Sequence, residues 1–146
     1  MRTAISLIAV CLLLGADAGP EAIKKEMALL DGEWSMVSGE RDGQALSEEL
    51  VKGAKRVVKS GETTVMIDGQ TVLKAKFMLD PTKKVKTIDY TITEGTNDGK
   101  TQLGIYELDG DTVKFCYAQP GKDRPTEFKT EAESGRTLSV WKKDKK

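Results

Sequence analysis

The stretch "GIYELDGDTVKFCYA", Gly104 to Ala118, decides the fold class of this chain. Two runs of alternating apolar and polar residues flank Asp109-Gly110-Asp111, and an Asp-Gly pair tolerates the positive φ angles of a tight hairpin. Alternation with a period of two is typical of a strand with one buried face. The stretch therefore predicts an antiparallel β-hairpin.

The same pattern continues on both sides of this hairpin. Short alternating runs are separated by Gly, Asp and Asn, with further turn signals at Asp68 to Gln70 and at Asn97 to Lys100. The runs begin at Trp34, Ala54, Thr63, Thr71, Thr87, Thr101, Thr112, Thr126 and Thr137. Eight or nine strands at this spacing predict an all-β domain, an antiparallel barrel or sandwich, and the missing crossover helices exclude a parallel α/β fold.

Two segments have helical character. Residues Gly19 to Leu30 place Ile23, Met27 and Leu30 on one helical face, which predicts a short helix before the first strand. In "SEELVKG", Ser47 can cap a short helix that Gly53 ends, and we expect this helix to close one end of a barrel.

The first residues resemble an export signal. Arg2 precedes an apolar run from Ala4 to Leu14, and Ala16 and Ala18 put small residues at the positions that signal peptidase reads. The run is too short for a stable membrane anchor, which needs about 20 residues. We therefore expect a signal peptide at 1–18, one β-barrel domain at 19–146 and a secreted or periplasmic protein without a membrane anchor after cleavage.

Composition argues against several kinds of chemistry. The chain has no histidine, so the usual nucleophile pairs and the ordinary metal ligand sets are missing. Lys and Arg total 23, as do Asp and Glu, which leaves no basic excess for a nucleic-acid partner. No arrangement in the sequence pairs the acidic residues with Cys116, the one cysteine after Ala18. We expect no enzyme, no cofactor and no metal.

Alternation assigns the barrel faces. The aromatic and β-branched side chains of the central strands fall on one face, which makes them candidates for lining a small, mainly aliphatic ligand cavity or for plain core packing. These candidates are Phe77, Tyr90, Ile92, Ile105, Phe115 and Tyr117. Cys116 falls on the other face, outward or under a loop, where we expect an inert packed thiol.

The stretch "KFCYAQPGKDRPTEF", Lys114 to Phe128, predicts the corner of a hairpin. Pro120-Gly121 forms a turn that cannot continue a ladder, and Arg124-Pro125 opens the next run. Asp89 has two open roles. It is either a buried partner for Arg124 or a surface carboxylate beside Thr87 and Thr91.

Four blocks in order resemble a family. "LLDGEWSMVSGERDGQAL", "FMLDPTKKVKTIDYTI", "GIYELDGDTVKFCYA" and "RPTEF" are similar to the uncharacterised, lipocalin-like secreted domain of planctomycete bacteria, across essentially the whole chain after residue 18. The resemblance implies an up-and-down barrel of the calycin type. It also implies that Trp34, in Gly32-Glu33-Trp34, plugs the closed end under a basic side chain from Lys142, Lys143 or Arg136, with Lys142 taken as the first choice.

The resemblance leaves the function open. One expectation is a binding module that holds a small apolar or amphipathic ligand inside the barrel. The alternative is a protein-interaction or inhibitor module on an inert scaffold, which predicts a packed interior and an exposed apolar patch, with its protein partner unknown. The interior of the barrel separates the two.

Overall fold

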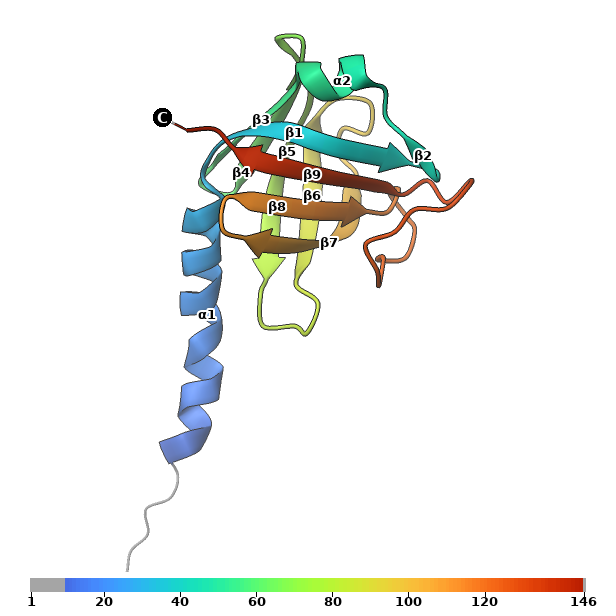
Figure 1. The fold of residues 1–146 in the computed structure, drawn as a ribbon. Helices are drawn as coiled ribbons and strands as arrows, with labels where there is room; N and C mark the ends of the chain where they lie inside the picture. Colours follow the sequence, from blue (N-terminus) through green and yellow to red (C-terminus); the bar gives the residue numbers. More distant parts are fainter. Residues whose placement is uncertain (1–9, 146) are drawn as a thin grey trace, which may run out of the picture.

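The computed structural model describes residues 10–145, with side chains described from residue 19 onward. The chain forms a closed antiparallel barrel, and one long N-terminal helix extends from one end of it (Figure 1). Eight strands follow one another around the barrel in chain order, and the first pairs with the last. The predicted all-β barrel is confirmed, and its sequential topology is calycin-like.

The barrel strands are β1 (Gly32–Arg41), β3 (Ala54–Lys59), β4 (Glu62–Ile67), β5 (Gln70–Asp80), β6 (Thr87–Glu94), β7 (Thr101–Asp109), β8 (Thr112–Tyr117) and β9 (Thr137–Lys143). A ninth strand, β2 (Gln44–Ala45), extends the end of β1 as a small hairpin. The predicted run at Thr126–Glu131 is wrong. It lies in the irregular β8–β9 connection, from Ala118 to Arg136, which we call the β8–β9 loop.

Tight turns set the register of the barrel. The β4–β5 hairpin turns at Asp68 and Gly69, which have φ angles of 50° and 82°. Both angles are positive, as a hairpin turn that matches the strand twist requires. In the β7–β8 hairpin, Asp109 pairs with Thr112, so Leu108 faces Val113 across the ladder.

The helices sit at opposite ends of the barrel. Helix α1 (Val10–Leu30) leads into β1, and its last turn packs Met27 and Leu30 against the core. Helix α2 (Glu48–Gly53) starts at the predicted cap, since Ser47 Oγ accepts a hydrogen bond from the backbone N–H of Leu50 at 3.2 Å. Figure 1 shows α2 at the end away from α1.

The predicted signal peptide reaches into α1. Residues 1–9 lie outside the described residues, and the expected cleavage point after Ala18 falls within the helix, so cleavage stays a prediction. Among the described residues we find no helix with the length and hydropathy that a membrane span requires.

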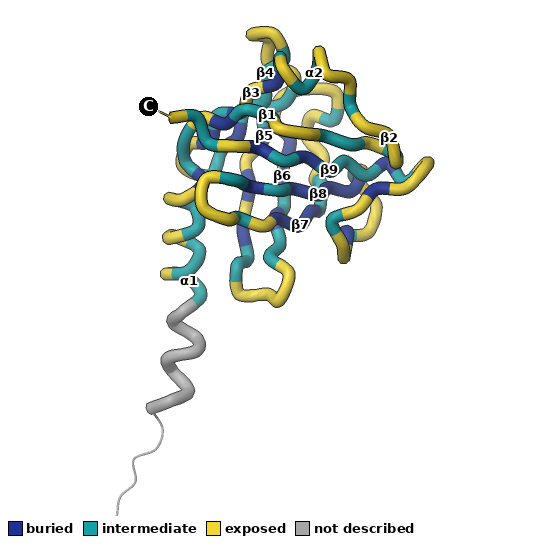
Figure 2. Tube along the Cα trace, in the orientation of Figure 1, coloured by how far each residue is buried: buried dark blue, intermediate teal, exposed yellow. Residues whose placement is uncertain are grey.

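The core fills the α1 end of the barrel. Inward side chains alternate with exposed ones along the strands, so buried and exposed segments follow each other along the trace in Figure 2. The largest buried side chains include Trp34, Tyr106 and Ile88. On β5, Leu73, Ala75, Phe77 and Leu79 all belong to the core or pack against it, so Phe77 lies on the inward face that alternation predicted for it.

Candidate functional site

The α2 end of the barrel is hollow. A cavity of about 730 Å³ opens there between the ends of the strands, α2 and the β6–β7 turn. This volume lies within the range of about 300–1,000 Å³ that is common for small-molecule sites. One half of the barrel is therefore packed and the other is open.

The cavity has two unlike walls. The aliphatic wall comes from β1, the β2–α2 connection, α2, β4 and β5, and consists of Met36, Leu46, Leu50, Val65, Ile67, Val72 and Leu73. The polar wall comes from the β6–β7 turn, the start of β7, the start of the β8–β9 loop and the start of β9, and includes Thr96, Asn97, Gln102, Gln119 and Thr137. Such a division suits a molecule with an apolar side and a polar side.

Arg56 lies at the inner end of the cavity. Arg56 is only 4% exposed, because every second residue of β3, namely Ala54, Arg56 and Val58, points to the inward face. Its Cζ atom lies 4.7 Å from the centroid of the Phe115 ring and 4.5 Å from that of Trp141. Stacking on aromatic rings stabilises a guanidinium in a partly dry site.

The hydrogen bonds of Arg56 are incomplete. Its Nη1 donates to Thr63 Oγ1 at 3.0 Å and to the Tyr90 hydroxyl at 3.3 Å. The Tyr90 hydroxyl also shares a hydrogen bond with the Tyr117 hydroxyl. The buried Nε of Arg56 has no hydrogen-bond partner among the described residues. Burial lowers the pKa of Arg56, but the neighbouring Tyr117 and Tyr90 outweigh it and raise the pKa overall, so the guanidinium stays charged.

The two phenols remain neutral at physiological pH. Burial raises the pKa of Tyr90, and burial together with the neighbouring Tyr90 raises the pKa of Tyr117 well above its usual value. Both hydroxyls can therefore donate a proton in a hydrogen bond. Ser139, whose Oγ accepts from Trp141 Nε1 at 2.9 Å, adds another hydroxyl at the cavity.

The structure divides the predicted cavity residues. Tyr90 and Tyr117 line the cavity. Phe77, Ile92 and Phe115 face inward but belong to the packed core. Tyr90 contacts both Phe77 and Phe115 edge to face, at centroid distances of 6.0 and 6.5 Å, so the aromatic core continues directly into the cavity.

Ile105 does not face the cavity, and its predicted position is wrong. The turn that pairs Asp109 with Thr112 also pairs Tyr106 with Phe115 and Ile105 with Cys116. Tyr106 therefore points inward and Ile105 outward, where it is buried. The apolar residues on both faces of β7 made the alternation ambiguous.

Cys116 lies beneath the β8–β9 loop, on the face predicted for it. The thiol is fully buried, and its Sγ lies 3.7 Å from the carbonyl oxygen of Lys129 in that loop. Burial raises the pKa of Cys116, which disfavours the reactive thiolate.

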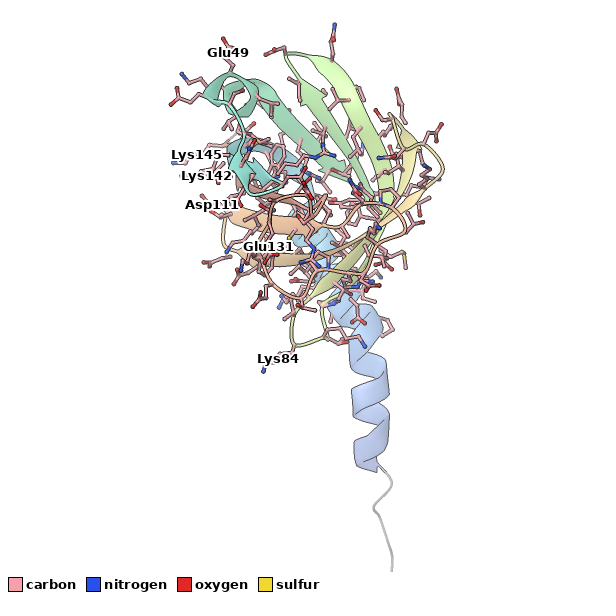
Figure 3. The ribbon with its side chains drawn as sticks, turned by 90° about the vertical axis from the view of Figure 1, so that its right-hand side faces the viewer. Glu49, Lys84, Asp111, Glu131, Lys142 and Lys145 are labelled. Carbon is pink, nitrogen blue, oxygen red and sulfur yellow. The ribbon has the colours of Figure 1, made fainter. Side chains whose placement is uncertain are left out.

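The closed end has the predicted indole. Trp34 is fully buried, and its Nε1 donates to the carbonyl oxygen of Leu30 at 3.0 Å. Lys143 lies over the ring, with Nζ 5.1 Å from the centroid. The first choice, Lys142, is wrong, because Trp34 pairs with Lys143 in the register and Lys142 pairs with Ser35. Lys142 is exposed, and its side chain lies at the outer surface in Figure 3.

Asp89 and Arg124 form an ion pair. Arg124 Nη2 lies 2.6 Å from Asp89 Oδ1, and its Nη1 donates to the carbonyl oxygens of Ile88 and Gly104 at 3.2 and 2.8 Å. The Asp89 side chain is 46% exposed, so the pair is only partly buried. Arg124 thereby attaches the β8–β9 loop to β6 and β7, which explains how this corner is built.

Sequence reasoning missed Arg56. The signal was present in "AKRVVK", where period-two alternation puts position 56 on the same face as Ala54 and Val58. A charged residue on an otherwise apolar face marks either a strand edge or a built interior site.

The chain was compared with protein-family models, with curated proteins and with solved structures, and none of the three comparisons found a match.

Proposed function

We propose that this protein is an exported, lipocalin-like binding module, which acts without catalysis and holds a small amphipathic molecule inside its barrel. The observation behind this proposal is the cavity of about 730 Å³ at the α2 end, with its aliphatic wall facing a polar wall. A barrel that served only as a scaffold would gain stability by filling this volume with side chains.

The exposed surface supports the same choice. Large exposed apolar residues come from four separate segments of the described chain, namely α1, β1, β5 and the β5–β6 loop. They are Leu29, Val37, Val72, Met78 and Val85. Scattered apolar residues are ordinary on soluble proteins and do not by themselves mark a protein interface. We therefore prefer interior binding to an interaction or inhibitor role.

Native mass spectrometry tests this proposal on the full chain purified from its own source. We expect a bound small molecule that is released on denaturation. The variant Ile67→Trp places an indole in the cavity and should lose that mass, whereas Val37→Trp, on an exposed bulge of β1, should keep it. Interior binding would be refuted if the native mass contained no small molecule and the chain co-purified with another protein.

A further inference from the structure

The cavity has a one-sided charge. Three of its lining residues are basic, Arg41, Arg56 and Lys100, and none of those that the structure describes is acidic. The chain as a whole has equal numbers of basic and acidic residues. The cavity therefore departs from the balance of the molecule toward positive charge, which attracts an anion and steers it to the mouth.

Arg56 is the residue that makes the positively charged cavity a candidate anion-binding site. Burying a guanidinium without a carboxylate partner costs free energy. Contacts with aromatic rings and neutral hydroxyls offset only part of the hydration free energy that the charge loses. The described residues form no salt bridge with Arg56, and its Nε is unpartnered. An anion in the cavity would supply the missing charge.

We propose that Arg56 holds the head group of a small amphipathic monoanion of the carboxylate class, with its apolar body against the aliphatic wall. This inference rests on the proposed function and names the ligand class for the same cavity. One guanidinium compensates one negative charge, whereas a second charge at this depth would stay uncompensated. A carboxylate oxygen can accept a charge-assisted hydrogen bond from the guanidinium, which is shorter and stronger than a hydrogen bond between neutral groups.

The tyrosines complete the head-group site. Arg56 Nη1 donates to the Tyr90 hydroxyl, so the Tyr90 oxygen already serves as an acceptor. When Tyr90 donates its own proton to the Tyr117 oxygen, the Tyr117 proton is left to donate into the cavity. The anion then receives a hydrogen bond from a phenol as well as from the guanidinium.

Octanoate and 1-octanol test the inference, because they share a chain of eight carbons and differ in the charge of the head group. Both are titrated into the isotope-labelled full chain and followed by amide chemical shifts. The guanidinium gives a charge-assisted hydrogen bond to octanoate and only an ordinary one to 1-octanol, so octanoate should bind at least about tenfold more tightly. The largest shifts should come from residues that line the cavity.

Two variants with the same charge change sharpen the comparison. Arg56→Gln should remove the preference for octanoate, whereas Lys59→Gln, at an exposed position of the same strand, should keep it. Thermal unfolding checks that the Arg56→Gln variant is folded. If the variant is unfolded, the octanoate and 1-octanol titrations of the unmodified chain test the inference without it.

The outcomes separate the two proposals. Equal binding of octanoate and octanol, or an unchanged preference in a folded Arg56→Gln, overturns the carboxylate assignment and leaves interior binding standing. Binding of neither probe overturns both proposals.

Discussion

At the scale of single residues, Arg56 is the least expected feature of this barrel. It occupies an inward position that a methylene-rich apolar residue could fill, between the rings of Phe115 and Trp141. Replacement of a buried charge by an apolar side chain of similar volume is often neutral or stabilising. A charge kept in such a place indicates a role other than stability.

Arg56→Met should therefore leave the free energy of unfolding unchanged or raise it, by up to roughly 1–4 kcal/mol, because the cost of burying the charge disappears. Chemical denaturation measures this difference. Arg124→Met is the matched control. It leaves the carbonyl oxygens of Ile88 and Gly104 without their donor and should lose about 1–3 kcal/mol. A larger loss in Arg56→Met than in Arg124→Met would show that Arg56 is a structural residue.

At the scale of elements, the sequence predicted the strands well and their faces less evenly. β5, β6 and β8 have one apolar face each, so their alternation identified the inward residues correctly. β7 is apolar on both faces because the β8–β9 loop covers its outside, and only the turn at Gly110 fixes which face turns inward. No periodicity within β7 contains that information.

The β8–β9 loop was mistaken in part for a strand for a related reason. The residues at Thr126–Glu131 alternate, but their partners lie in tertiary contacts that no local pattern reveals. Thr130 Oγ1 accepts from the backbone N–H of Gly43 at 2.9 Å, and Lys114 lies over the ring of Phe128 at 5.0 Å. Side-chain contacts thus hold this loop where a strand would use backbone pairing.

Helix α2 is the element whose stability should govern access to the cavity. Leu46 and Leu50 line the mouth, and no residue of α2 itself is buried, so the helix depends on its cap. Ser47→Ala removes a cap worth about 1 kcal/mol. Hydrogen exchange of the α2 amides should accelerate by roughly fivefold, and a bound amphipathic ligand should dissociate faster. Ser38→Ala, on an exposed part of β1, is the control, and unchanged exchange in α2 would contradict this role.

At the scale of the whole molecule, the barrel is built as two halves. Helix α1, Trp34 and the aromatic core fill one end, while the other end keeps a cavity with a charged inner end and an aliphatic wall. The fold followed from alternation and turns, and the buried indole of Trp34 followed from the family resemblance. The cavity did not, because its volume depends on how eight strands close around one another, and its buried charge depends on Arg56, one residue in an apolar row.

The central claim is that the interior holds an amphipathic anion, and a crystal structure of the full chain grown with octanoate tests it most directly. We expect the hydrocarbon chain along Met36, Ile67 and Leu73, with a carboxylate oxygen about 2.7–2.9 Å from the Arg56 guanidinium. A cavity filled by its own side chains, or octanoate bound only at the outer surface, would contradict the claim.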